Sequence, residues 1–153
     1  MDFDSASFSF LPADPSVSIA EIGVNHNGDM VLAKKLIDEA IKCGADIVKF
    51  QAFVAEEEIS KFADKADYQK ETTGSGGGQL EMAKALELNH KQLTEIRDYC
   101  REKGAPFLCT AFDYTSLDFL VNELQVKAIK IASSEVTNHP FLRAIARSGV
   151  GII

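Results

Sequence analysis

The sequence has no tryptophan, no cluster of Lys and Arg, and no apolar stretch of the ~18 residues that a membrane-spanning helix needs. Its net charge of -7 argues against a nucleic-acid binder, because such a protein needs a basic stripe along the phosphate backbone. Asp2 and Asp4 lie where a secretory signal carries Lys or Arg. We therefore expect a cytoplasmic protein that binds neither nucleic acid nor membranes.

The sequence also has few cysteines, and their spacing matches no known framework. Cys43, Cys100 and Cys109 are odd in number and form no CxxC pair, which argues against a disulfide scaffold and a structural zinc site. Each lies in an apolar run, so we expect all three to be small buried side chains in a reducing compartment.

Short apolar runs rich in Val, Ile and Phe alternate with longer stretches of helical spacing along the whole chain. The runs do not alternate strictly between apolar and polar residues, as is typical of parallel strands buried on both faces. The expected strands are 17–23, 46–50, 106–110, 128–133 and 150–153.

Four helical stretches follow the first four of these strands. The first has an apolar stripe over 33–41 and ends at Gly44, which suits a left-handed stop. The second begins at Asn89 with Gln92 three residues later, the spacing of a capping box. The third and fourth begin at Asp113 and Asn138.

This βα repeat predicts an α/β protein, either doubly wound or a (β/α)8 barrel of the TIM type. A complete barrel takes about 250 residues, and the chain reaches its last residue within the fifth apolar run. We therefore expect the N-terminal portion of a barrel, with about five strands and four helices, in residues 17–153, preceded by an extension over 1–16.

The connection between Phe50 and Asn89 is far longer than an ordinary βα loop of about 2 to 6 residues. It contains the glycine-rich stretch 74–78 but no phosphate-binding pattern. A mobile active-site loop is the favoured interpretation, and a disordered surface insertion is the alternative.

Polar residues interrupt the strands near their carboxyl ends, the edge where barrel sites form. These residues are Glu21, Lys49, Gln51, Thr110, Lys130, Ser133, Ser134 and Glu135. Burying a lysine costs several kcal/mol unless it is paired, and two lysines in one cavity repel each other unless an anion lies between them. The pattern favours a phosphate or carboxylate ligand on Lys49 and Lys130. The alternative is that each lysine pairs with Glu21 or Glu135 as part of the barrel interior.

Histidines give a weaker signal. His26 follows the first strand and could act as a general base, as a turn-stabilising residue or in substrate positioning, but one histidine among amides is not a metal set. His90 and His139 stand beside helix starts, where we expect them to be solvated.

Four blocks, IAEIGVNHNGD, GADIVKFQAF, FLCTAFD and KIASSEVTNHP, resemble the sialic acid synthase family in order and spacing. Members of that family condense phosphoenolpyruvate with an N-acetylated hexose of the mannosamine type, giving a nine-carbon 2-keto acid and phosphate. The resemblance implies a (β/α)8 barrel followed by an antifreeze-like domain in a domain-swapped homodimer. It also implies a divalent metal, Mn2+ or Mg2+, whose ligands lie outside this chain.

The resemblance also implies roles for individual side chains. It assigns Lys49, Thr110, Lys130 and Ser133 to phosphoenolpyruvate. It assigns Glu21, Gln51 and Glu135 to the sugar and the reacting centre, with Glu21 and Glu135 as the catalytic candidates for proton transfer. The family's sugar-contacting asparagine has no counterpart between Phe53 and Asn89, so the acceptor sugar stays open.

Two other functions fit the same residues. One is a different phosphoenolpyruvate or phospho-sugar aldolase on the same barrel. The other is a half-barrel without catalysis, which associates through the strand edge near Ile153.

Overall fold

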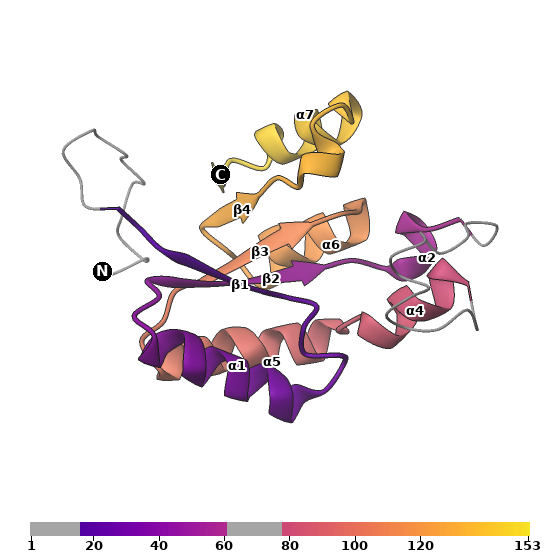
Figure 1. The fold of residues 1–153 in the computed structure, drawn as a ribbon. Coiled ribbons are helices and arrows are strands. Elements are labelled where there is room, and N and C mark those ends of the chain that lie inside the picture. Colours follow the sequence, from indigo (N-terminus) through magenta and orange to yellow (C-terminus); the bar gives the residue numbers. More distant parts are fainter. Residues whose placement is uncertain (1–15, 61–77) are drawn as a thin grey trace.

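The structure, a computed structural model, describes residues 16–60 and 78–153, in which five strands form one parallel sheet. The strands are β1 (Ile19–Gly23), β2 (Ile47–Ala52), β3 (Phe107–Ala111), β4 (Ala128–Lys130) and β5 (Gly151–Ile152). They pair in the order β1-β2-β3-β4-β5, so each strand lies beside its successor in the sequence (Figure 1). A doubly wound sheet would reverse this order partway, whereas a barrel does not. The strand order therefore confirms the barrel interpretation.

The four expected helices are present. They are α1 (Met30–Lys42), α5 (His90–Glu102), α6 (Tyr114–Asp118) and α7 (His139–Arg147). The third continues as a π-helical turn, η1 (Phe119–Glu123), and α1 lies beside α5 under the sheet (Figure 1).

The helix boundaries follow the expected local signals. Asn89 and Gln92 form the predicted capping box, each accepting a backbone N–H of the other at 3.0 Å. Gly44 and Gly104 have φ values of +84° and +71°, as left-handed helix stops require. The sequence thus specifies both ends of α5 locally.

In the described parts of the long connection after β2 there are two further helices. They are α2 (Ala55–Glu58) and α4 (Gln79–Leu86), which contact each other beyond the carboxyl end of β2 (Figure 1). The expected mobile active-site loop falls largely on 61–77, outside the described residues.

The apolar core is divided between the two faces of the sheet. On one face Val48, Phe50 and Cys109 pack against α1 and α5, together with Ala33 and Ile96. The opposite face carries a smaller apolar cluster of Ile47, Leu108 and Ala128. Since side chains alternate along a strand, the polar residues that share the parity of Ile47 and Leu108 lie on this second face.

Three expectations need correction. The fourth strand ends at Lys130, and Ser133–Glu135 form a 3-10 turn, η2, because the chain already bends toward α7 there. Cys43 is exposed, since it caps the C-terminus of α1. His90 is half-buried and stacks on Phe119 with ring centroids 3.9 Å apart, whereas His139 is exposed as expected.

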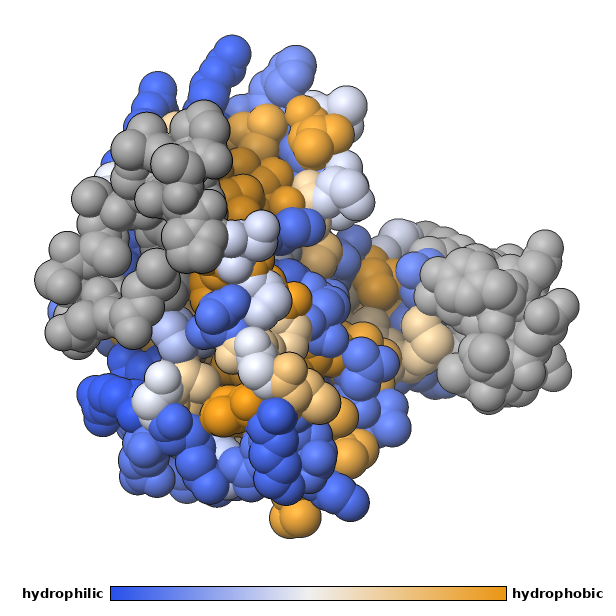
Figure 2. All heavy atoms as spheres, turned by 60° about the vertical axis from the view of Figure 1, so that its left-hand side comes forward, coloured by the Kyte–Doolittle hydropathy of each residue, from blue (hydrophilic) through white to orange (hydrophobic). Residues whose placement is uncertain are grey.

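Hydrophilic side chains cover much of the face shown in Figure 2, and apolar side chains lie in patches between them. The exposed large apolar residues of the described ranges are Ile19, Val31, Tyr114, Val136 and Ile152. No helix in the described part of the chain is both long and apolar enough to cross a membrane.

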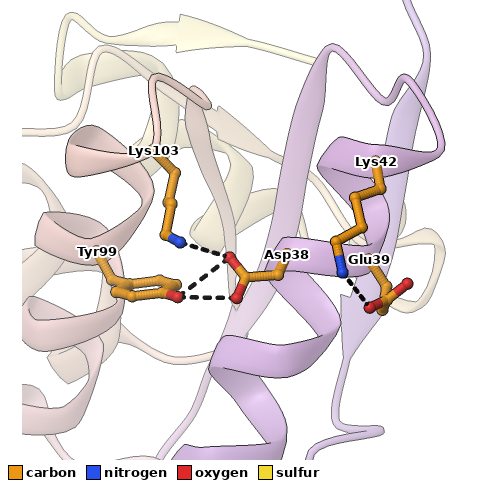
Figure 3. Close-up of polar contacts among 5 residues, drawn as sticks. All are labelled: Asp38, Glu39, Lys42, Tyr99 and Lys103. Carbon is orange, nitrogen blue, oxygen red and sulfur yellow. Dashed lines mark hydrogen bonds and ion pairs between the residues drawn. The ribbon is translucent and has the colours of Figure 1, made fainter.

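Between α1 and α5, polar contacts join the two outer helices (Figure 3). The Tyr99 hydroxyl donates to the two carboxylate oxygens of Asp38 at 3.0 and 3.1 Å, and Lys103 pairs with the same carboxylate at 3.0 Å. These contacts lower the pKa of Asp38, chiefly through Lys103. They hold the helix after β1 against the helix before β3.

Candidate functional site

The predicted site residues of the first three strands lie on the sheet face opposite the helices. Glu21 pairs in register with Lys49, and Gln51 pairs with Thr110. Thr110 is also in register with Lys130 on β4. In-register neighbours of a parallel sheet point to the same side, so these five side chains lie on one face near the carboxyl ends of the strands. They occupy two successive rungs, Glu21 with Lys49 and then Gln51 with Thr110 and Lys130, and are together called the polar row.

Lys49 is the most buried charged residue of this row, with 8% of its surface exposed. Its ammonium forms an ion pair with the Glu21 carboxylate and donates a hydrogen bond to Thr110 Oγ1 at 3.4 Å. The pairing alternative suggested by the sequence is therefore present for Lys49. Because the Glu21 side chain is half exposed, its carboxylate stands between the buried lysine and solvent.

A bulge in β1 makes room for this pair. The register between β1 and β2 shifts between Glu21 and Gly23, and Gly23 has a φ of +54°. A Cβ on Gly23 would lie 2.7 Å from Glu21 Oε1 and 3.4 Å from Gln51 Nε2. Our sequence reasoning missed Gly23, although a glycine inside a strand pattern is a recognised signal of a bulge.

Lys130 and Ser133 are less engaged than Lys49. Lys130 is partly buried and has no ion-pair partner within the described ranges. Ser133 is exposed on the 3-10 turn after β4. The structure thus brings Glu21, Lys49 and Thr110 into contact.

Glu135 belongs to a second group at the same edge of the sheet. Its carboxylate accepts hydrogen bonds from Asn138 Nδ2 at 2.7 Å and from Ser134 Oγ at 3.3 Å. Asn138 is also the N-cap of α7, since its Oδ1 accepts the Phe141 N–H at 3.3 Å. Our sequence reasoning used Asn138 only as a helix start and missed its contact with Glu135.

Three successive loops at this edge of the sheet each carry a carboxylate. Partial desolvation raises the pKa of Glu58 at the end of α2, and the negative charges of Asp113 and Glu135 raise it further. These residues follow β2, β3 and β4 respectively. The loops that carry candidate site residues therefore influence one another electrostatically.

His26 stabilises the turn after β1. Its side chain is buried, its Nδ1 accepts the Gly28 N–H at 3.0 Å, and its ring stacks on Phe50. Burial lowers the pKa of His26, and a hydrogen bond with the Gly23 backbone opposes the shift. Of the roles that the sequence left open, this geometry supports the turn-stabilising one.

No group of three or more His, Cys, Asp and Glu side chains within 16–60 and 78–153 is arranged to hold a metal ion. The two buried cysteines do not supply a nucleophile either. Burial raises the pKa of Cys100 to about 12 and raises that of Cys109 well above its ordinary value. The polar row itself offers ammonium, carboxylate, hydroxyl and amide groups, from Lys49 and Lys130, Glu21, Thr110 and Gln51.

Comparison with known proteins gives a consistent result. Residues 36–153 match the NeuB family. The chain is 50% identical over 135 residues to an N,N'-diacetyllegionaminic acid synthase of Campylobacter jejuni, covering 88% of this chain and 40% of that protein. The corresponding synthase of Legionella pneumophila is 44% identical, with 88% and 38% covered. The chain thus spans about two fifths of the length of these curated relatives.

Solved structures agree with the sequence matches. The N-acetylneuraminic acid synthetase of Leptospira borgpetersenii superposes with a TM-score of 0.73 at 32% identity, covering 91% of this chain and 44% of that one. The spore coat polysaccharide biosynthesis protein SpsE of Bacillus subtilis gives 0.68 at 34% identity, with 92% and 36% covered. The chain belongs to the NeuB family, and its fold is the N-terminal portion of the sialic acid synthase barrel.

Proposed function

We propose that this chain contributes the phosphoenolpyruvate-binding half of a sialic-acid-type synthase. The observation that carries the proposal is the polar row across four neighbouring strands, in which buried Lys49 contacts Thr110 and in which Thr110 is in register with Lys130. Two ammonium groups and a hydroxyl suit a small anion that carries both a phosphate ester and a carboxylate.

The proposed reaction is the one that the resemblance to the sialic acid synthases implies, and these groups are compatible with it. Lys49, Thr110, Lys130 and Ser133 hold the phosphate and carboxylate of phosphoenolpyruvate. Its C3 attacks the aldehyde carbon of the open-chain sugar, and the aldehyde oxygen takes up a proton. Water then adds to C2, and phosphate leaves by cleavage of its C–O bond, which leaves the 2-keto acid. Glu21 and Glu135, assigned to the sugar together with Gln51, are the side chains proposed for these proton transfers.

We propose further that the acceptor is a six-carbon sugar with two acetamido groups. This is supported by identities of 50% and 44% to the N,N'-diacetyllegionaminic acid synthases, against 37% to the N-acetylneuraminate-9-phosphate synthase of Mus musculus. Three carbons of a nine-carbon product come from phosphoenolpyruvate, so the remaining six carry both acetamido groups.

The remaining expectations are part of the same proposal. A divalent metal, Mn2+ or Mg2+, would polarise the aldehyde, and its ligands would come from outside the described residues. We also propose that the protein forms a homodimer. We propose that it acts in the cytoplasm, the compartment in which phosphoenolpyruvate is made.

The test uses the complete gene product that contains these residues. It is supplied with phosphoenolpyruvate and, in parallel, with a diacetamido hexose, N-acetylmannosamine or its 6-phosphate, and phosphate release is measured. We expect the fastest release with the diacetamido sugar, and a loss of about 100-fold or more in Lys130→Ala. Release that does not depend on phosphoenolpyruvate, or near-normal turnover of Lys130→Ala, contradicts the assignment.

Borohydride trapping separates the synthase from an aldolase on the same barrel. A Schiff-base aldolase leaves a covalent adduct on Lys49 or Lys130 after reduction, whereas the proposed synthase leaves both lysines unmodified. Peptide mass spectrometry after borohydride treatment with each substrate reads out the difference.

A further inference from the structure

The Asp113 carboxylate accepts hydrogen bonds from the segment after β2 and from the segment after β3. It lies two residues after β3, is 6% exposed, and caps α6 by accepting the Ser116 N–H at 2.6 Å and the Ser116 hydroxyl at 2.8 Å. Its Oδ2 also accepts the N–H of Val54, on the segment after β2, at 2.8 Å. The same carboxylate therefore serves two loops.

The two loops joined by Asp113 directly follow strands that carry paired site residues. Gln51 and Thr110 are in register on β2 and β3, and Val54 and Asp113 each lie three residues further along. A bond from the Phe112 N–H to the Ala52 carbonyl at 3.2 Å extends the ladder between them. The Asp113 contact is thus the next cross-strand tie beyond the regular sheet.

The start of α2 depends on such remote partners. Its N-cap, Val54, offers no side-chain cap, and the N–H of Ala55 is satisfied by Glu87 Oε2 at 2.8 Å. Two carboxylates from distant parts of the chain therefore accept the N–H groups of the N-cap and of the first residue of this short helix. Thr115 also donates to Glu57 at 2.7 Å, which adds a second tie between α2 and α6.

We propose that Asp113 is a positioning residue of the synthase site, which fixes the carboxyl ends of β2 and β3 and so the placement of Gln51 and Lys49 relative to Thr110. Its kinetic consequence rests on the function proposed above. The charged carboxylate suits this role because hydrogen bonds to an ionised acceptor are shorter and stronger than neutral ones. A displacement of about 1 Å at a reacting group costs about 100-fold in rate.

A purely structural alternative is that Asp113 does no more than cap α6. Asp29 provides the matched comparison, because its Oδ1 caps α1 through the N–H groups of Val31 and Leu32 at 2.7 and 3.3 Å. Replacing either residue by Asn preserves a good N-cap. In Asp113→Asn, however, the remaining oxygen caps α6 at the position of Oδ1, and the NH2 group takes the position of Oδ2 and faces the Val54 N–H, so the bond from Val54 is lost.

The experiment compares Asp113→Asn and Asp29→Asn in the complete gene product, well below the unfolding midpoint of each. We expect kcat/KM for phosphoenolpyruvate to fall about 10- to 100-fold in Asp113→Asn and to stay within about twofold in Asp29→Asn. Asp113→Ser, which also keeps a cap, is the substitute if the first variant does not fold, with the same expected loss. Kinetics within twofold of the parent protein in the folded Asp113 variant overturn the proposal.

Hydrogen exchange at the amides of 50–54 provides a readout that does not depend on the reaction. Faster exchange of this segment in Asp113→Asn, and not in Asp29→Asn, supports the positioning role even if the protein proves inactive with phosphoenolpyruvate. Unchanged exchange overturns the positioning role, whereas absent phosphate release in the parent protein refutes the proposed function alone.

Discussion

The carboxylate of Glu21 and the ammonium of Lys49 form an ion pair across β1 and β2, directly in register on the sheet face opposite the helices. Lys49 is buried and Glu21 is half exposed, so the pair has one solvated end. An anion that approaches Lys49 from solvent competes with Glu21 for the same ammonium. We therefore expect anion binding at Lys49 to be coupled to the stability of the sheet.

We expect Glu21→Gln to lower the free energy of unfolding by about 1–2 kcal/mol, because Lys49 then keeps a poorly solvated charge without its partner. The loss is smaller than for a fully buried pair, since Glu21 is half exposed. Inorganic phosphate should restore part of this loss, which thermal unfolding with and without phosphate measures.

The control for this variant is Glu39→Gln, which breaks the exposed ion pair with Lys42 at 2.7 Å. We expect a much smaller change there, because solvent screens an exposed pair, and no phosphate effect. Equal losses in the two variants would show that Lys49 does not depend on Glu21.

The buried His26 gives the protein a pH dependence of known sign. Burial holds its folded pKa below the ordinary value of 6.5, so the unfolded chain takes up the proton first as the pH falls. The stabilisation is complete above that value and is lost as the pH falls through the lower folded pKa. Denaturant unfolding at about pH 7.5 and about pH 5.5 measures this loss.

His26→Asn should reduce the loss of unfolding free energy between about pH 7.5 and about pH 5.5, because asparagine does not titrate. The Asn Oδ1 can still accept the Gly28 N–H in place of Nδ1. His139→Asn, at an exposed histidine, is the control and should keep the dependence of the parent protein. An unchanged pH dependence in His26→Asn would refute the assignment to His26.

Replacing Gly23 by alanine tests the bulge that makes room for Glu21. Alanine there combines a φ of +54° with a Cβ 2.7 Å from Glu21 Oε1, so the carboxylate has to move. We expect a loss of stability of about 1–2 kcal/mol from the backbone alone, and a loss of phosphate release because Glu21 and its ion pair are displaced.

Gly44→Ala separates these two effects, since Gly44 has a φ of +84° and no atom within 4 Å of its Cβ position. It should share the loss of stability and keep the rate of phosphate release. Similar rates in the two variants would mean that the contact with Glu21 is unimportant.

Sequence patterns a few residues long correctly predicted the helices whose ends depend on contacts between near neighbours in the chain. The capping box of Asn89 and Gln92 and the glycine after α1 define helix ends by contacts a few residues apart, which a sequence pattern records. The five apolar runs likewise became the five strands in their expected order.

The missed features depend on distant partners. The first N–H groups around α2 are satisfied by Asp113 and Glu87, 59 and 32 residues away, so no local cap marks this helix. The early end of β4 follows from the turn at Ser133–Glu135, and the sequence continues there with residues that suit a strand equally well. The polar row was predictable because period-2 spacing places Lys49 and Gln51 on one face. Its ion pair required the register between β1 and β2.

Asn138 holds Glu135 in a way that a substitution can isolate. Asn138→Ser keeps an oxygen that can cap α7 but removes the Nδ2 donor that contacts Glu135 at 2.7 Å. We expect the free energy of unfolding to change by no more than about 0.5 kcal/mol. Phosphate release should fall about tenfold, because Glu135 keeps only the longer bond from Ser134.

Asn89→Ser is the matched control, since Asn89 caps α5 and its side chain accepts the Gln92 N–H without contacting a candidate site residue. It should change stability by a similar amount and leave phosphate release unaffected. If both variants lose rate equally, the effect comes from weaker capping rather than from Glu135. If Asn138→Ser keeps the full rate, Glu135 does not need the Asn138 amide to hold its position.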